Sequence, residues 1–339
     1  MSLVHMDGFD LYASSADLQT VYNIGGGAYI NTTGGRFGGG AVVTNNQYVA
    51  YSVPGALTEI WFGFAYNCQN PTSYGGVTTV TSNAGVEMTL FYRPLTGQID
   101  VCTNAGDSPV IGTATIAGLA SGWHWIEVHF KLSSSSGVVE LWVDGVQQVN
   151  VTGINTANRG GTSISAVFLG TDYSNNLNAL IDDFYILNPT TGSYNTGRLG
   201  DSRIETLKPS SDASPNNGTP STAGSHYAMV DEAQNDGSSS YITITNTSGQ
   251  EELYGFGSLA ATPANVRAVK VSNWCEKTDA GSCFGESVVS SSSTVSNGSS
   301  LPLLTGFSNI YNIYESDPHT SAAWTYSAVN SAYAGFRIT

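Results

Sequence analysis

The sequence predicts an all-β protein built from two sandwich-like domains, and three observations support this fold class. Short segments alternate apolar and polar residues with a period of two, as strands with two unlike faces do. Gly, Asn, Ser and Asp cluster between these segments, where tight turns require them. Charged residues make up only 11% of the chain, against roughly 25% in an average globular domain. Such a surface is typical of a β-rich protein with many turns.

Residues 122–149 give the clearest strand signal. Apolar residues alternate with aromatic or charged ones in Trp123–Leu132, and again in Val138–Val143 after a serine-rich loop. Asp144-Gly145 then supplies the positive φ angles of a two-residue type I′ turn. We therefore predict three consecutive antiparallel strands, the third entered through the Asp-Gly turn.

Residues 1–189 are predicted to form the first domain, a jelly-roll sandwich, because strand-like segments and glycine-rich turns follow one another throughout. Glu59–Cys68 illustrates the pattern, with Phe62 and Phe64 on one face and Gly63 and Ala65 on the other. The predicted strands are Gln47–Val53, Glu59–Cys68, Val77–Thr81, Val86–Tyr92, Gln98–Cys102, Trp123–Leu132, Val138–Val143, Ser163–Leu169 and Ala179–Leu187.

The composition changes over residues 190–226, a Pro-, Ser- and Asn-rich connection expected to run as extended surface backbone. Its strand-like island, Ser202–Leu207, is expected to begin the second domain. Residues 200–339 are predicted to form that domain, a smaller C-terminal β-sandwich with one short helix within Ser321–Ser331. Ser287–Ser300 is a serine tract expected to form a solvated loop. Further strands are expected at Tyr241–Thr245, Glu251–Phe256, Val266–Cys275, Ser287–Ser290, Tyr311–Glu315 and Gly335–Thr339.

The charge balance excludes several classes of partner. The net charge is −15 with only 11 Lys plus Arg, whereas nucleic-acid binders need basic residues to replace phosphate counterions. Anionic membrane surfaces are disfavoured for the same reason. No apolar run approaches the ~20 residues of a transmembrane helix, and the first residues lack the basic and apolar regions of a secretory signal. A virion component, made in the bacterial cytosol and released by lysis, combines these properties with an extracellular type of composition.

The four cysteines, Cys68, Cys102, Cys275 and Cys283, include no CxxC pair, so a zinc ribbon or thioredoxin-type site is not expected. Cys275 and Cys283 flank a turn-like stretch and could face each other across a hairpin. For a protein made in the cytosol we expect four buried, reduced thiols.

Five short motifs follow one another along the first 190 residues: Met6-Asp7-Gly8-Phe9, Gly35-Arg36-Phe37-Gly38-Gly39, Gly122-Trp123-His124-Trp125-Ile126-Glu127-Val128, Val139-Glu140-Leu141-Trp142-Val143-Asp144-Gly145 and Leu180-Ile181-Asp182-Asp183-Phe184-Tyr185-Ile186. In this order and spacing they resemble the concanavalin A-like lectin/glucanase superfamily, in its laminin-G-like branch. The resemblance implies two antiparallel sheets packed face to face, one of them concave.

Three later segments extend the resemblance to the whole chain: Gly200–Pro209, Tyr227–Glu232, and the ending around Tyr314–Pro318, Trp324 and Ala328–Asn330. Together with the first domain they resemble structural proteins of tailed bacteriophages. This implies a virion protein that is associated with the tail or fibre, or that decorates the capsid exterior. Its expected partners are other virion proteins, host-surface glycans and further copies of itself.

Catalytic chemistry is not expected. Laminarinase-type members of the superfamily carry Glu-x-Asp-x-x-Glu on one strand, where two carboxylates act as nucleophile and acid, and this chain has no such motif. Its adjacent carboxylates, Asp182-Asp183, should point to opposite faces of a strand, one of them solvated and one bonded to turn amides. The laminin-G-like resemblance also implies a calcium option, with Asp172, Asn175, Asp182 and Asp183 as hard oxygen donors.

One constellation remains as a candidate contact surface. If Trp123–Leu132 pairs with Val138–Val143, one face of the sheet carries Trp125, Glu127, His129, Glu140 and Trp142. Tryptophan offers flat apolar area with a polar edge, which suits both sugar stacking and protein interfaces. Trp123, by contrast, is expected to plug the sandwich edge.

The sequence therefore favours a non-enzymatic virion structural protein that binds neighbouring subunits and host glycans by surface complementarity. A phage-borne polysaccharide-degrading enzyme of the same fold is the first alternative, and detectable release of reducing ends would distinguish it. A bacterial carbohydrate-binding module is the second, and a secretory signal would have favoured it.

Overall fold

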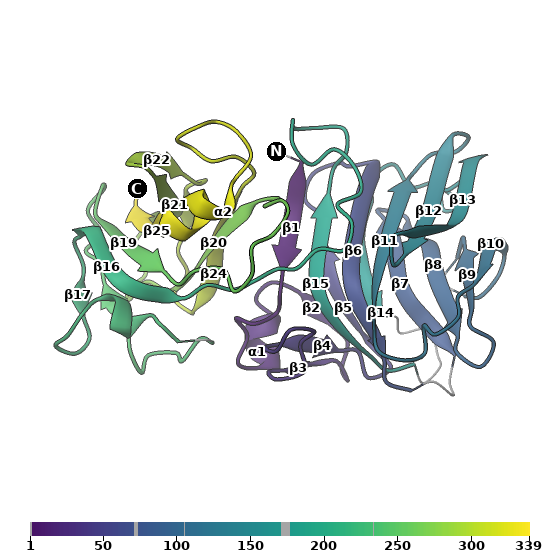
Figure 1. Ribbon diagram of the computed structural model, residues 1–339, viewed down its shortest axis with the longest axis horizontal. Helices are drawn as coiled ribbons and strands as arrows, with labels where there is room; N and C mark the ends of the chain where they lie inside the picture. The colour runs from purple at the N-terminus through teal and green to yellow at the C-terminus, as the bar shows by residue number, and fades with distance from the viewer. Residues whose placement is uncertain (1, 71–73, 105, 171–176, 233) are drawn as a thin grey trace. The chain divides into compact units, whose positions relative to one another are not determined.

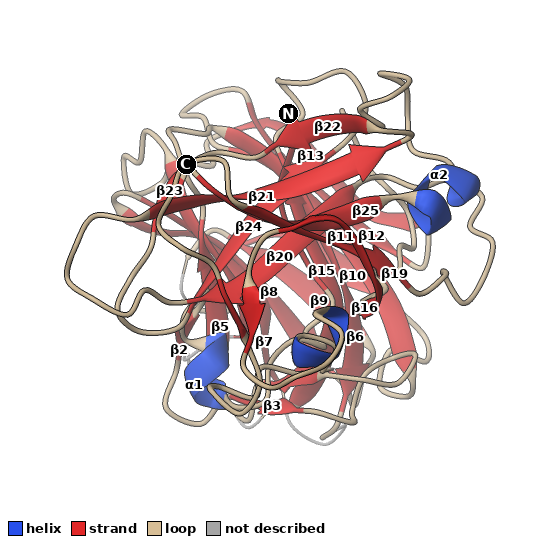
Figure 2. Cartoon of the chain, turned by 90° about the vertical axis from the view of Figure 1, so that its left-hand side faces the viewer, coloured by secondary structure: helices blue, strands red, loops and turns tan. Residues whose placement is uncertain are grey.

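The computed structural model describes residues 2–70, 74–104, 106–170, 177–232 and 234–339. The chain divides into two compact units, Met1–Ile204 and Glu205–Thr339. Both are built from antiparallel strands, and the described helices are short (Figure 2). The predicted all-β fold class is therefore confirmed. No helix within the described ranges has the length and apolar character needed to cross a bilayer.

The first unit contains an eight-stranded sheet with the order β13-β12-β11-β6-β15-β4-β3, in which β1 also pairs with β15 (Figure 1). Its longest strands coincide with the strongest alternating segments of the sequence. The bounds are β1 Leu3–Asp7, β3 Tyr29–Asn31, β4 Ala41–Val43, β6 Glu59–Cys68, β11 Trp123–Lys131, β12 Gly137–Val143, β13 Val146–Ile154 and β15 Ala179–Leu187.

A seven-stranded sheet with the order β10-β9-β8-β7-β14-β5-β2 forms the second layer of this unit. The helix α1, Ser15–Leu18, precedes β2 and begins with a capping box between Ser14 and Asp17. The strand bounds are β2 Asn23–Ile24, β5 Tyr48–Ser52, β7 Gly75–Ser82, β8 Gly85–Arg93, β9 Gln98–Cys102, β10 Val110–Thr115 and β14 Ile164–Gly170.

The core of the first unit lies between the two sheets. Alternate residues of the central strands β6 and β11, such as Phe62, Phe64 and Val128, are 0% exposed, and burying each such side chain contributes about 1.5–3 kcal/mol. His5 of the eight-stranded sheet stacks on Tyr51 of the seven-stranded sheet, with ring centroids 3.8 Å apart. We call the face of the eight-stranded sheet that is turned away from this core its outer face.

The predicted turn after β12 is present. Asp144 and Gly145 have φ angles of 49° and 80°, and they connect β12 to β13 as a two-residue hairpin requires. The strands β1, β2, β3, β4 and β10 were not predicted. Most are only two to five residues long, too short for alternation to separate them from loops.

The second unit is a smaller sandwich. Its six-stranded sheet has the order β16-β19-β25-β21-β22, with β23 also paired to β21, and it packs on the β20–β24 pair through a cluster that includes Val271, Val289 and Trp324. The bounds are β16 Pro209–Asn216, β17 Thr219–Pro220, β18 Ile242–Thr243, β19 Glu251–Phe256, β20 Val269–Cys275, β21 Phe284–Ser291, β22 Thr294–Asn297, β23 Leu301–Pro302, β24 Ser308–Tyr314 and β25 Tyr333–Ile338, with helices η1 Tyr227–Met229 and α2 Tyr326–Ser331.

Two sequence-based expectations for this part of the chain are wrong. Ser202–Leu207, all of it described, is not a strand, and the first strand of the second unit is instead β16. The serine tract is not a solvated loop, because β21 and β22 form a hairpin within it and Ser287, Ser290 and Ser291 are buried. The predicted strand Ser287–Ser290 lies within β21 and is confirmed, but serine is a weak strand former, and composition concealed its partner β22.

All four cysteines are free thiols. Cys68 and Cys102 are buried, whereas Cys275 and Cys283 are only half-buried, so the expectation of four buried thiols holds for two of them. Burial raises the pKa of Cys102 and of Cys275 to about 12. Both thiols are consequently protonated at neutral pH, which makes them weak nucleophiles.

Candidate functional site

The predicted aromatic and acidic constellation lies on one face of the eight-stranded sheet. In the β11–β12 ladder Glu127 lies opposite Trp142, and His129 lies opposite Glu140. Residues paired in this way project from the same side of a sheet. Because the intervening residues of β11 fill the core, this side is the outer face. The register therefore confirms that Trp125, Glu127, His129, Glu140 and Trp142 share a face.

His129 lies between two carboxylates near one end of this face. Its Nε2 is 2.9 Å from Glu59 Oε1, and its Nδ1 is 3.6 Å from Glu140 Oε1. The Trp61 ring stacks on the imidazole at a centroid distance of 4.5 Å and an interplanar angle of 6°. These contacts fix the position of the imidazole and leave it only 13% exposed.

Trp142 and the edge strand β13 complete the accessible part of the outer face. The indole Nε1 of Trp142 donates a hydrogen bond of 3.2 Å to Glu140 Oε2. Gln147 and Asn150 of β13 lie opposite Trp142 and Glu140, and both are exposed. We call the set Glu59, His129, Glu140, Trp142, Gln147 and Asn150 the strip. It combines one half-buried aromatic ring with carboxylate and amide groups.

Glu127 is completely buried beside the strip. Its Oε1 accepts hydrogen bonds from the Tyr185 hydroxyl at 2.7 Å and from the Gly200 N–H at 2.8 Å. Its Oε2 accepts one from Arg198 Nη1 at 2.9 Å. A buried charge is tolerated only when it is paired and hydrogen-bonded in this way. Glu127 is thus a structural anchor for the segment that contains Arg198 and Gly200.

That segment, residues 198–204, crosses the outer face, and we call it the strap. At one end Arg198 lies over the Trp142 ring, with its Cζ 4.4 Å from the ring centroid. Further along, both carboxylate oxygens of Asp201 accept bonds of 2.7 Å from the Arg36 guanidinium. At the other end the Ile204 N–H donates to Asp183 Oδ1 at 2.7 Å. Ion pairs and hydrogen bonds therefore hold the strap along its length.

Trp125 is almost fully buried at 1% exposure. It stacks on Tyr185 at 6.2 Å, and the Arg36 guanidinium lies 5.8 Å from its ring centroid. Trp125 and Glu127 were predicted as contact residues, but both are buried, Glu127 beneath the strap and Trp125 beneath Arg36. The sequence pattern could not reveal this, because the residues that cover them, Arg198 and Gly200 for Glu127 and Arg36 for Trp125, lie at least 71 positions away in the chain. Trp123, predicted to plug the sandwich edge, is half-buried at the end of the same strand.

Asp182 and Asp183 lie in a β-bulge, where the register of β15 against β6 shifts and Asp183 adopts a φ of 54°. Both are buried, so the expectations of one solvated carboxylate and of strict alternation are wrong. Asp182 accepts bonds of 2.7 Å from the N–H groups of Arg36 and Asp183. Burial raises the pKa of both carboxyls, and the charge of Asp183 raises that of Asp182 further.

This pair does not fit a calcium site. Three of its four carboxylate oxygens accept backbone hydrogen bonds, and only Asp183 Oδ2 has no hydrogen-bond partner among the described residues. Calcium takes about six to eight oxygen ligands. Asp172 and Asn175, the other predicted ligands, lie outside the described residues. In the part of the chain that the structure describes, no cluster of His, Cys, Asp or Glu has the arrangement of a metal site.

A polar cluster on the seven-stranded sheet was not predicted. Asp100 accepts hydrogen bonds from Gln98, Thr113 and Arg93, at 2.7, 2.8 and 3.1 Å. Although burial favours the neutral form, these bonds outweigh it and lower the pKa of Asp100. Arg93 also lies over the exposed ring of Tyr74, 5.4 Å from its centroid. Period-two alternation, with Ile99 and Val101 in the core, was the sequence signal for this outward-facing group.

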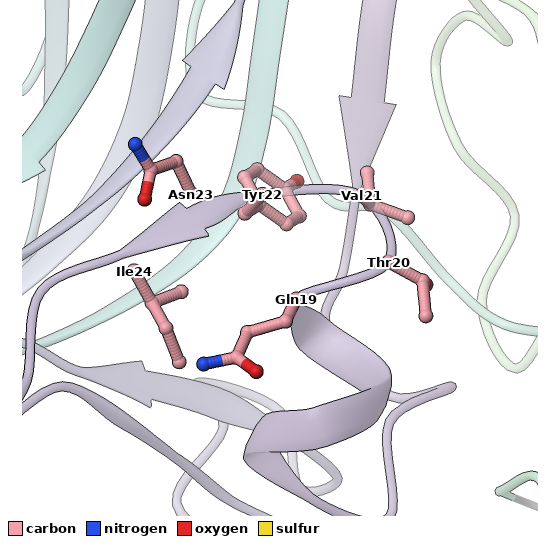
Figure 3. Close-up of a pocket in the computed structure, with 6 residues that line it drawn as sticks. All are labelled: Gln19, Thr20, Val21, Tyr22, Asn23 and Ile24. Carbon is pink, nitrogen blue, oxygen red and sulfur yellow. The ribbon is translucent and has the colours of Figure 1, made fainter.

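A shallow depression of about 420 Å³ is lined by Gln19, Thr20, Val21, Tyr22, Asn23 and Ile24 (Figure 3). All six residues come from one continuous stretch. The Tyr22 hydroxyl is engaged inside the protein, since it donates a hydrogen bond of 3.0 Å to buried Asp7 and lies 2.6 Å from His5 Nε2. Burial and the nearby Asp7 carboxylate raise its pKa well above 10.0. The depression therefore offers no activated group.

No protein-family model matches the sequence, and no curated protein matches it. Several solved structures are similar over about half of this chain. A Bacillus subtilis protein of unknown function with a galectin-like fold is 8% identical, with a TM-score of 0.39 and coverage of 55% of this chain and 96% of that one. For a carbohydrate esterase of the Shiga toxin-encoding bacteriophage phi24B the values are 13%, 0.38, 55% and 97%. For a double mutant of the alginate lyase Aly36B in complex with alginate trisaccharide they are 14%, 0.36, 53% and 96%. At these identities and TM-scores no functional assignment follows.

Proposed function

We propose that this protein is a non-enzymatic structural component of a tailed-phage virion, and that its first unit binds host-surface glycans or neighbouring subunits through the outer face of the eight-stranded sheet. The observation that carries the proposal is the strip. There Trp142 offers an aromatic ring beside Glu140, Gln147 and Asn150, which lie on adjacent, rigidly paired strands.

Recognition of this kind depends on side chains that are held in place before the ligand arrives. Trp142 is bonded to Glu140, and His129 lies between Glu59 and Glu140 under the Trp61 ring. A sugar ring or a partner side chain can stack on the part of the half-buried Trp142 indole that Arg198 leaves accessible, while the amides of Gln147 and Asn150 supply both donors and acceptors. The strip is therefore better suited to binding than to bond cleavage.

The buried carboxylates support the absence of catalysis. Glu127 accepts bonds from three donors and is sealed from solvent, so it cannot reach a substrate while the strap is in place. Asp182 uses its two oxygens to hold backbone N–H groups. A glycosidase needs two carboxyl groups facing a shared substrate, and neither residue meets this requirement.

The virion part of the proposal is supported by composition and by the resemblance of the sequence to tailed-phage structural proteins. Low charge, many Ser, Thr and Asn residues, and 18 Tyr suit a protein that contacts neighbours over much of its surface. We expect the chain to form homo-oligomers, because most soluble oligomers consist of identical subunits related by symmetry.

Mass spectrometry of purified virions from a host that carries the gene tests the virion role directly. We expect the chain in the particles, with a copy number that separates decoration (many copies) from receptor binding (few). Absence from the particles would refute the virion role.

A glycan array with the recombinant protein tests the binding role. Trp142→Ala should abolish any glycan signal, whereas Trp274→Ala, in the second unit, should retain it. Enzymatic activity is excluded only if host polysaccharide yields no reducing ends. Release that is lost in His129→Ala would instead make the Glu59–His129–Glu140 group an acid–base centre.

A further inference from the structure

Arg198, a residue of the strap, covers the Trp142 ring on the outer face. Its guanidinium lies over the Trp142 ring, 4.4 Å from the centroid, and donates to Glu127 Oε2 at 2.9 Å. The Arg198 side chain is nevertheless 31% exposed, while that of Glu127 is 0% exposed. An arginine at the surface thus covers a tryptophan face and a buried carboxylate at once.

Displacing Arg198 would uncover a specific set of groups. Glu127 Oε2 would become an unpaired acceptor, beside the Tyr185 hydroxyl and the ring of Trp142. Trp125 lies next to Glu127 on the same face, with Arg36 over its ring, and its buried Nε1 has no hydrogen-bond partner among the described residues. Buried orphan donors are rare, and each calls for an explanation such as a water or a ligand.

These groups are complementary to the apolar face and to the hydroxyl groups of a pyranose ring. The C–H face of a sugar packs on indole, and vicinal hydroxyls donate to a carboxylate as the guanidinium does. With Arg198 displaced, the carboxylates Glu59, Glu127 and Glu140 outnumber Lys131, and His129 is shared between two of them. Arg36, which lies over Trp125, is already paired with Asp183 and Asp201. A uronic or sialic acid would meet like charge there, which costs binding energy. A neutral sugar would not.

We propose that the strap, together with Arg36, covers a cryptic site for a neutral pyranose, formed by Glu127, Trp142, Tyr185 and Trp125, and that the sugar enters by displacing Arg198 from Trp142. This inference rests on the proposed glycan-binding function and names its residues and ligand class. Because only the fraction of molecules with an open strap can bind, the apparent affinity is reduced by that fraction. Removing Arg198 should therefore strengthen binding.

Hydrogen-exchange mass spectrometry tests the opening of the strap without a ligand. In the wild type, peptides covering 198–204 should exchange at least tenfold faster than peptides of β11, because the strap opens locally. Arg198→Ala should accelerate strap exchange about tenfold more and leave β11 unchanged. Arg159→Ala removes the same charge from a residue away from this face and should change neither. Exchange of the strap at the rate of β11 in both the wild type and Arg198→Ala would refute the proposal.

An array of neutral and acidic oligosaccharides tests the ligand class. Arg198→Ala should bind neutral glycans about tenfold or more tightly than the wild type, and acidic ones no better. If this variant fails to fold, Arg198→Gln, which keeps part of the aliphatic stem and removes the charge, takes its place. Weaker binding, unchanged binding, or a gain for acidic glycans would each overturn the cryptic site. Absence of all glycan binding would also overturn it, together with the glycan part of the proposed function, whereas detection of the chain in virions would leave the virion role intact.

Discussion

Gly63 lies directly opposite Tyr185 in the β6–β15 ladder, and a Cβ on that glycine would come 2.5 Å from Cε1 of the tyrosine. The same Cβ would lie 3.0 Å from Cγ of Glu127 and 3.1 Å from Cζ2 of Trp125. The missing side chain is what allows these three residues to close over the centre of the outer face. Gly63 therefore permits the buried arrangement beneath the strap.

Gly63→Ala should lower the free energy of unfolding by about 1–3 kcal/mol, the range for overpacking a close-packed site. The tyrosine ring and the tryptophan are both packed, so neither can move aside cheaply. Urea denaturation with an unchanged m-value measures the effect. Gly26→Ala is the matched control, since a Cβ there meets no atom within 4 Å, and it should fall within about 0.5 kcal/mol of the wild type. Equal stability of both variants would mean that the face repacks freely.

Tyr185→Phe should destabilise the first unit by about 1.5–3 kcal/mol, because it removes a hydrogen bond to a buried charge. The lost bond is the 2.7 Å contact from the Tyr185 hydroxyl to Glu127 Oε1. Tyr92→Phe deletes the same atom from a tyrosine whose buried hydroxyl has no hydrogen-bond partner among the described residues. That change should be neutral or slightly stabilising. A similar loss in both variants would show that the bond to Glu127 contributes nothing specific.

The stability of the first unit should fall as the pH rises above the ordinary aspartate range near 4. Burial raises the pKa of both Asp182 and Asp183 in the folded state, so over this range the folded chain binds more protons than the unfolded one. Each such proton changes stability by about 1.4 kcal/mol per pH unit, and the sign is a loss on raising the pH.

Asp183→Asn should flatten this dependence between about pH 4 and pH 8, since it removes one titrating group and its charge. Asparagine also tolerates the positive φ at this position. Thermal melts across the range provide the measurement. Asp107→Asn, which changes a half-exposed carboxylate in the connection between β9 and β10, should keep the wild-type slope. A steeper slope in Asp183→Asn would contradict the direction assigned to the pair.

The turn between β21 and β22 holds two serines in a backbone conformation that is unfavourable for serine. Ser292 and Ser293 form the two-residue connection with φ angles of 45° and 67°, a conformation that favours Asn and Gly. The double substitution Ser292→Asn and Ser293→Gly should stabilise the second unit by about 1–2 kcal/mol. Ser135→Gly, at an exposed loop serine without a positive φ, should bring no gain. Calorimetry distinguishes the two results, and no increase in Tm for the double variant would show that the turn is unstrained.

Alternation predicted the strands that matter most for the site. The strands β6, β9, β15 and β19 have the predicted bounds, and the face shared by Glu127 and Trp142 followed from period two together with the expected pairing of their two strands. Local patterns were sufficient because strand periodicity and turn chemistry are properties of adjacent residues. They failed at Asp182–Asp183, where a bulge resets the alternation, and in the serine tract, where the sheet determines the pairing.

The sequence by itself determined the fold class, the long strands and the set of residues on the outer face. Only the tertiary structure decided which of those residues meet solvent. Glu127 and Trp125 are buried because Arg198, Gly200 and Arg36, distant in sequence, lie over them. A period-two pattern assigns a side chain to a face but contains no information about a chain segment that later crosses it. The cost of burying a charge is met there by three long-range donors, and two of them, Arg198 and Gly200, are in place only once the strap has folded onto the sheet.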